Sequence, residues 1–311
     1  MPELPDLEGY RVALDRALRG HVLEEVAVYH PFLLRSAGTP LESAIGRTVL
    51  RTHRRGKRIA IEFDGGPVFV FHLMIAGRFR WKDSTESGPA KPPARKSGTL
   101  ARLVFENGSL SLTEAGTRRR ASLHVVLDID DLRALDPGGS ELLDGQMDAE
   151  TFATLLRSEN HTLKRSLTDP RLFSGIGNAY SDEILFAARM SPFAMTQSLS
   201  DAECARLFVA AVRTLGEWRD RFVAEASERF PAKVTAFRPE MHVHGKYDTP
   251  CSVCGTPIQR IRYADNESNY CPTCQTGGKV YADRALSRLL KSDWPRTVEE
   301  LEKLKRPPTS R

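Results

Sequence analysis

The sequence predicts an α+β multidomain protein: an N-terminal β-sandwich with flanking helices, followed by a C-terminal helical module and a zinc-ribbon-like finger. Three observations support this fold class. Up to about residue 140, short segments rich in β-branched and aromatic residues alternate with turn signals. From about residue 148, apolar residues recur at helical spacing. Farther on, four of the five cysteines form two closely spaced pairs.

The chain begins MPELPDLEGY, which places acids beside prolines and precedes a helix expected over residues 6–19. One interpretation is simply an acidic start to that helix. The other requires removal of Met1, which would leave Pro2 with a nucleophilic secondary amine at the chain start. Glu3 could then move protons for that amine. Taken alone, the segment favours the first interpretation.

The first part of the chain is predicted to be β-rich. Five segments have the composition of short strands, and turn signals such as DGG and ENGS separate several of them. This pattern suits a sandwich or barrel. The stretch DSTESGPAKPPARKSG interrupts the series and is predicted to be a polar surface loop. The predicted strands cover residues 22–30, 59–63, 68–74, 101–107 and 122–128.

Helical segments dominate the chain from about residue 148. MDAETFATLLRS opens with acids, and a long helix follows Ser200, which forms a predicted capping box with Glu203. Between these segments, one helix should end near Pro170 and another should begin after the turn at residues 175–178. A Gly-x-Gly turn that opens a helix suits a phosphate. It does not fit the dinucleotide-binding fingerprint, which needs a preceding strand and a third glycine.

The cysteine pairs have the spacing of a structural zinc site. Each C-x2-C turn directs two thiolates to one point, and sixteen residues separate the two turns. Four thiolates leave no open position for catalysis, so we expect one structural Zn²⁺. The stretch TPIQRIRYA predicts a β-hairpin that displays Arg260 and Arg262, and Cys204 is expected to be a buried helix residue. The predicted zinc ligands are Cys251, Cys254, Cys271 and Cys274.

Composition and charge limit the kinds of binding partner and the cellular compartment that we expect for this protein. The net charge of +5 and the pI near 9.0 favour an anionic partner without naming it. No membrane span is expected, because the chain lacks a run of about 18 apolar residues. The acidic N-terminus lacks an apolar signal segment, which predicts a cytoplasmic protein. We also expect a monomer.

These segments resemble, in the same order, the motifs of the formamidopyrimidine-DNA glycosylase and endonuclease VIII (Fpg/Nei) family of DNA repair enzymes. PELPDLE resembles the family's N-terminal catalytic motif, and RRGKRIA resembles its segment with a lysine on a β-turn. GIGNAYSDEILFAA resembles its helix–two-turn–helix signature, and CSVCG with CPTCQ resembles its zinc finger. The resemblance extends to Gln275 and favours the catalytic interpretation of the chain start.

The resemblance implies four domains. These are an N-terminal catalytic β-sandwich over residues 1–140, a helix–two-turn–helix DNA-binding domain over 148–240, a zinc-finger hairpin over 241–276 and a C-terminal helical extension over 277–311. The extension has no counterpart among the family motifs. Its apolar spacing predicts helices that pack back on the protein.

The resemblance also implies a bifunctional DNA glycosylase and AP lyase that acts on damaged DNA in base excision repair. Pro2 would attack the sugar C1′ of a flipped nucleotide, release the base and form a Schiff base from which β,δ-elimination cuts the strand. Glu3 would protonate the sugar ring oxygen or transfer protons. Lys57 would contact the phosphate beside the lesion, although a solvated basic hairpin is the alternative. Asp6 stands where the family usually has glutamate.

Further family positions imply DNA contacts. Lys164 and Asn178 would bind phosphates around the flipped nucleotide. Ile75 would fill the space left by the flipped base, with Met74 as its rival. Arg119 lies in LTEAGTRRRAS, where many members carry an arginine–phenylalanine pair that contacts the opposite base.

Two questions stay open at this point. Asn266 occupies the usual position of a phosphate-binding arginine in the zinc hairpin, so either Arg260 or Arg262 compensates or backbone binding is weaker there. The preferred lesion is an oxidised purine, an oxidised pyrimidine or another damaged base.

The alternative to an active enzyme is a non-catalytic or lesion-specialised DNA-binding relative. A bare binder has no need of the catalytic residues together, so the enzyme is favoured.

Overall fold

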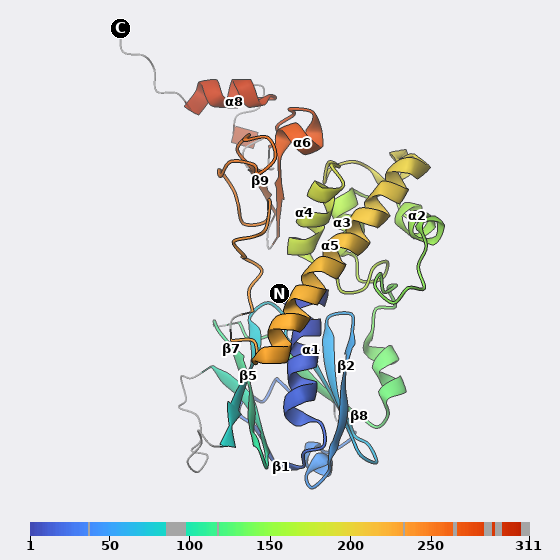
Figure 1. The fold of residues 1–311 in the computed structure, drawn as a ribbon, viewed down its shortest axis with the longest axis vertical. Helices are drawn as coiled ribbons and strands as arrows, with labels where there is room; N and C mark the ends of the chain where they lie inside the picture. Colours follow the sequence, from blue (N-terminus) through green and yellow to red (C-terminus); the bar gives the residue numbers. More distant parts are fainter. Residues whose placement is uncertain are drawn as a thin grey trace. The chain divides into compact units, whose positions relative to one another are not determined.

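The computed structural model describes residues 1–36, 38–84, 98–116, 118–232, 234–263, 266–282, 288–289 and 294–305. Most of the polar loop predicted within residues 83–98 lies outside this part of the chain. Contacts divide the chain into two compact units (Figure 1). The first comprises Met1–Glu141 and Leu215–Thr235, and the second comprises Leu142–Thr214 and Ala236–Arg311. The boundaries of the four predicted domains stay a prediction.

The first unit contains the predicted sandwich, built from two four-stranded antiparallel sheets. One sheet has the strand order β1-β6-β7-β5 and the other β2-β3-β4-β8. All five predicted strands are present. Three more, β2, β5 and β7, were not singled out in the sequence because charged and small polar residues interrupt their apolar pattern. The strands are β1 (Leu23–Val28), β2 (Val49–Arg55), β3 (Arg58–Phe63), β4 (Val68–His72), β5 (Gly77–Asp83), β6 (Thr99–Phe105), β7 (Gly108–Glu114) and β8 (Ser122–Val126).

The sheet that contains β3 and β4 is buried on both faces in its middle. Alternate residues such as Ile59 and Phe71 enter the main core of the unit. The intervening Ala60 and Val70 pack with Leu132 of the 3-10 helix η3 (Ile129–Leu135). This covering explains why β4 is a continuous apolar run and does not alternate with polar residues. A second 3-10 helix, η1, spans Leu41–Ala44.

Helix α1 (Leu4–Leu18) starts two residues earlier than predicted because a capping box fixes its first turn. Glu3 is the N-cap residue, and its backbone N–H donates to Asp6 Oδ2 at 3.0 Å. The apolar face of α1 enters the main core. Helix α5 (Asp201–Glu228) approaches α1 closely at Gly9, where an added Cβ would lie 3.1 Å from Phe222 Cβ.

The second unit carries the predicted helices and the finger. Ser200 and Glu203 form the predicted capping box of α5, and Gly177 caps α4 after the predicted turn. Beyond the finger, the Val280 N–H donates to Arg296 O at 2.9 Å, so the extension folds back on itself there. The elements are α2 (Ala149–Arg157), α3 (Leu163–Thr168), α4 (Asn178–Ala187), η4 (Thr196–Ser198), β9 (Gln259–Arg262), β10 (Glu267–Tyr270), α6 (Pro272–Thr276) and α8 (Val298–Lys305).

Within the described chain, no helix combines the length and hydropathy needed to cross a bilayer. One helix of the predicted C-terminal extension, α8, is present. The rest of that prediction falls largely on residues 283–287, 290–293 and 306–311, outside the described residues.

Candidate functional site

The start of the chain is buried and fixed in place. Pro2 and Glu3 are both buried, and the capping box holds the backbone at Glu3. The α-amine of this chain belongs to Met1, and burial lowers its pKa below the ordinary value of 8.0. The Glu3 carboxylate opposes that shift, whereas the positive charges of Arg78 and Lys57 add to it. A neutral amine therefore forms at lower pH here than on a solvated terminus.

Lys57 lies in a two-residue turn between β2 and β3. Gly56 has φ 54°, a left-handed conformation that glycine adopts without steric cost. Burial lowers the pKa of Lys57, and the nearby Glu3 carboxylate opposes that effect. The fold thus brings three sequence-predicted residues, Pro2, Glu3 and Lys57, to one end of the first unit.

A buried ion network that the sequence did not predict supports the Lys57 turn. The Arg54 Nε donates to Glu8 at 2.6 Å, and its two terminal nitrogens donate to Glu141 at 3.0 and 2.7 Å. Glu141 also accepts the backbone N–H of Gly56 at 3.0 Å. Helix α1 and the β2–β3 turn are therefore joined through one guanidinium.

His72, at the end of β4, is a second residue that the sequence did not single out. It pairs across the sheet with Arg58. Burial lowers the pKa of His72 to about 4, and the positive charges of Arg58 and Lys57 and the neighbouring His124 act in the same direction. A neutral imidazole leaves Nδ1 free to accept the N–H of Met74, at 3.2 Å. The sequence did not single out Arg58 or His72, because their pairing depends on the register of β3 and β4.

The two rival wedge residues differ sharply in exposure. Ile75 is 57% exposed, although it is a large apolar residue. Met74 is half-buried and has φ 52°. The turn therefore exposes Ile75 to solvent more than Met74.

The arginine-rich segment after β7 is anchored by a buried acid. Glu114 Oε2 accepts the backbone N–H groups of Arg120 and Ala121 at 2.9 and 3.0 Å. Arg119 is half-buried, whereas Arg118 and Arg120 are exposed. The segment presents positive charge from a fixed backbone.

In the second unit, Lys164 and Asn178 meet at the start of α4. The buried Lys164 ammonium forms an ion pair with Asp182 and donates to the Asn178 carbonyl at 3.0 Å. Two of its three N–H donors are therefore engaged. Asn178 is the first residue of α4, and its side chain is partly exposed beside the positive end of the helix dipole.

Two adjacent carboxylates on α4 connect this helix to the finger. Glu183 accepts three consecutive backbone N–H groups, from His242 to His244, each at 2.9 Å. Asp182 Oδ2 lies 2.9 Å from His244 Nδ1 and accepts from Asn269 of β10 at 3.0 Å. The helix–two-turn–helix segment and the zinc hairpin are thus one structural block.

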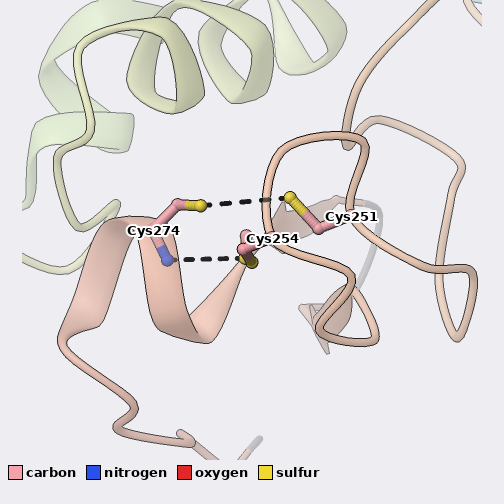
Figure 2. Close-up of side chains that lie close together, drawn as sticks. Cys251, Cys254 and Cys274 are labelled. Atoms are coloured by element: carbon pink, nitrogen blue, oxygen red, sulfur yellow. Dashed lines mark hydrogen bonds between the residues drawn. The ribbon is translucent and has the colours of Figure 1, made fainter.

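The four predicted cysteine ligands converge. Their Sγ atoms all lie within 4.8 Å of one another, and the pairs 251–274 and 254–271 are 4.0 and 3.4 Å apart. Thiolates around a tetrahedral Zn²⁺ at 2.3 Å would be separated by about 3.8 Å. Figure 2 shows Cys251 and Cys274 pointing toward each other from the finger loop and from α6. The donor set fits one structural Zn²⁺, as predicted.

The finger hairpin has two arginines in different settings. The Arg260 guanidinium lies 4.4 Å from the Tyr247 ring centre and 3.8 Å from Glu267. Arg262 is exposed at the end of β9, and Asn266 is exposed immediately before β10. Arg262 is therefore the more accessible cation. Cys204 is buried in α5, as expected.

Sequence models of three domains match this chain. They are the formamidopyrimidine-DNA glycosylase N-terminal domain over residues 1–123, the H2TH domain of the same enzymes over 139–218 and a zinc finger found in Fpg and IleRS over 249–277. The formamidopyrimidine-DNA glycosylase of a Thermus thermophilus strain is 32% identical over 284 residues, 89% of this chain and 100% of that protein. That of Moorella thermoacetica is 32% identical over 272 residues, 84% of this chain and 95% of that protein.

Solved structures agree with these matches. The crystal structure of the Thermus thermophilus Fpg (MutM) protein has a TM-score of 0.74 and 32% identity, and covers 88% of this chain and 98% of its own. A Lactococcus lactis Fpg bound to abasic-site DNA has a TM-score of 0.76 at 22% identity, covers 88% of this chain and 99% of its own, and shows the same fold. Because a 32% identical relative aligns over its whole length and three domain models match in order, the chain belongs to the formamidopyrimidine-DNA glycosylase family.

Proposed function

We propose that this protein is a bifunctional DNA glycosylase and AP lyase of base excision repair that acts on damaged DNA. The observation that carries the proposal is the buried, capped chain start, where Lys57 acts electrostatically on the Met1 amine and Glu3 acts on Lys57. A DNA-binding protein without catalysis has no need of a buried terminal amine. The relatives' name, formamidopyrimidine-DNA glycosylase, supports the same reaction class.

In the proposed reaction, removal of Met1 exposes the secondary amine of Pro2. The amine attacks C1′ of a flipped nucleotide, the bond from C1′ to the base breaks, and the base leaves with a proton. Glu3 protonates the sugar ring oxygen as the ring opens to the iminium. The iminium acidifies C2′–H, and loss of that proton expels the 3′ phosphate. A second elimination, with loss of C4′–H, expels the 5′ phosphate, and water then hydrolyses the iminium, which frees Pro2 and releases the sugar remnant as an unsaturated aldehyde.

The remaining residue assignments concern contacts with the DNA that surrounds the reacting sugar. Lys57 contacts the phosphate beside the lesion, and its partly buried ammonium aids elimination. Ile75, with Met74 behind it, fills the space that the flipped base leaves, and Arg119 contacts the opposite strand. We assign the site to a monomer in the cytoplasm, associated with DNA.

Asn178 and Lys164 bind a phosphate together at the start of α4. Asn178 offers its side-chain amide, and Lys164 offers its third N–H donor while it holds the Asn178 carbonyl. Arg262 contacts the backbone from the zinc hairpin, and Arg260 supports it from the same face of β9. The zinc ion holds this hairpin and takes no part in bond breaking.

The experiment that tests the proposal is covalent trapping. Protein with Met1 removed is incubated with abasic-site DNA and borohydride, and the adduct is mapped by peptide mass spectrometry. We expect the adduct on Pro2. Pro2→Gly should reduce trapping, whereas Pro5→Ala, in the same segment, should not. An adduct on a lysine, with undiminished trapping by Pro2→Gly, would contradict the assignment of Pro2, whereas the absence of any adduct would favour the DNA-binding relative.

A further inference from the structure

The turn between β4 and β5, residues 73–77, holds an exposed apolar side chain on a strained backbone. Met74 adopts φ 52°, which non-glycine residues seldom occupy. Such conformations persist where the surrounding structure determines them, and they concentrate at functional sites. The residue that follows, Ile75, is 57% exposed. The question is what holds this conformation.

Backbone contacts fix both ends of the turn. The Gly77 N–H donates to Leu73 O at 2.9 Å, and a Cβ on Gly77 would lie 2.2 Å from that same oxygen. His72 accepts the Met74 N–H through Nδ1 at 3.2 Å. These contacts close the turn, but among the described residues no backbone N–H donates to the Ile75 carbonyl at its apex.

Arg78 supplies that donor. Its Nη1 donates to Ile75 O at 3.1 Å and to Gly77 O at 2.6 Å. Its Nε donates to Val234 O at 2.6 Å. Val234 belongs to the main core of the first unit, so this third carbonyl is a fixed anchor. A guanidinium has five N–H groups in a rigid fork, which allows one side chain to hold three carbonyls.

We propose that Arg78 is a positioning residue that locks the 73–77 turn so that Ile75 is presented, rigid and apolar, for insertion into the DNA duplex. The inference rests on the proposed function, in which Ile75 replaces a flipped base. A side chain that separates stacked bases must work against the stacking energy. If the turn had to be ordered during binding, part of the interaction energy would be lost to that ordering. Arg78 removes this cost because the turn is ordered in advance.

The critical measurement is the ratio of trapping rates on duplex and on single-stranded abasic-site DNA. A wedge matters only where a stack must be opened, so Arg78→Met should lower this ratio by about 10- to 100-fold, as expected for a misplaced contact. Any effect of the Arg78 charge on the terminal amine acts on both substrates and cancels in the ratio. Arg80→Met, an exposed position on the same strand, is the matched control and should keep the wild-type ratio.

Two further variants test whether Arg78 acts as a clamp, meaning that its guanidinium holds the carbonyls of Ile75, Gly77 and Val234 in place. Arg78→Lys keeps the charge and loses the fork, so it should resemble Arg78→Met; full rescue by lysine would overturn the clamp in favour of a simple charge effect. In the Ile75→Ala background, Arg78→Met should cause no additional loss, because both changes remove one function. Additive losses, or an unchanged ratio for Ile75→Ala, would also overturn the inference.

A readout independent of catalysis separates this inference from the proposed function. 2-Aminopurine placed beside an uncleavable abasic analogue reports unstacking by fluorescence. Wild-type protein should raise the signal, and Arg78→Met should raise it less at saturating protein with unchanged zinc content. If wild-type protein traps no abasic DNA yet shows this difference, the proposed chemistry fails and the clamp stands. If trapping occurs and the fluorescence is equal for both proteins, the clamp fails and the chemistry stands.

Discussion

At the scale of single residues, the start of the chain is buried and held by hydrogen bonds. Chain ends usually fray, but here the Glu3 N–H is paired with Asp6, and both acids are buried. The short side chain of Asp6 accepts that N–H at 3.0 Å. The capping box therefore gives a structural reason for the acids at the start of the chain, and it is compatible with the proton transfer proposed for Glu3.

The capping contact between Asp6 and the Glu3 N–H should contribute measurably to the free energy of unfolding. Asp6→Ala leaves the Glu3 N–H without its acceptor and should lower the free energy of unfolding by about 1 kcal/mol, the usual effect of losing a helix cap. Urea unfolding measures this change. Glu25→Ala, on an exposed position of β1, is the control and should have a much smaller effect. Equal stability of Asp6→Ala and wild type would show that the cap is energetically idle.

The terminal amine should react at unusually low pH. Burial lowers the pKa of the Met1 amine, and the same burial should act on the Pro2 amine once Met1 is removed, so the midpoint of trapping against pH should lie below that of an N-terminal proline in a short solvated peptide. The positive charge of Lys57 disfavours the protonated amine, so Lys57→Met should raise the pKa and move the midpoint upward. Cyanoborohydride trapping across a pH series gives both midpoints. Lys82→Met, at an exposed lysine on β5, should leave the midpoint in place; a downward shift for Lys57→Met would contradict this electrostatic description.

At the scale of elements, local patterns predicted more than long-range pairings. The apolar run of β4 and the capping residues of α5 could be recognised in the sequence because each depends on neighbouring residues. The Arg54–Glu141 pair joins residues 87 positions apart, and its formation depends on how α1 and the β2–β3 turn pack. Strand register likewise places Arg58 beside His72. No local pattern encodes such partners.

Two turns, one in each unit, should respond differently to salt. Lys57→Ala removes one phosphate-neutralising charge and should make the logarithmic salt slope of DNA binding shallower by about 0.9. Asn178→Ala removes no charge and should weaken binding with little change in slope. Anisotropy titrations with an uncleavable abasic analogue across a salt series measure both, with Lys82→Ala as the control. An unchanged slope for Lys57→Ala would remove the phosphate assignment.

At the scale of the whole molecule, the zinc site is coupled to the DNA-binding helices through α4. Glu183 and Asp182 bind the chain before the finger and strand β10, so the metal stabilises more than its own loop. The cysteine spacing predicted the metal completely, because two C-x2-C turns specify their geometry locally. The α4 contacts could not be predicted, because acids in a helix usually face solvent. Because of these contacts, we expect loss of the metal to affect α4 as well as the finger.

Loss of zinc should therefore weaken DNA binding and loosen the second unit while the sandwich stays folded. Cys251→Ser removes one zinc ligand, so the zinc content measured by elemental analysis should fall from one ion per chain toward zero. The affinity for an uncleavable abasic analogue should fall with the zinc content. Hydrogen exchange should rise over residues 242–276 and in α4, because the Glu183 contacts lose their partner segment, and should stay unchanged in β3 and β4. Cys204→Ser, at the buried cysteine outside the cluster, should keep the zinc. Normal zinc and DNA binding by Cys251→Ser would show that the metal site is wrong, and exchange confined to the finger loop would show that α4 does not depend on it.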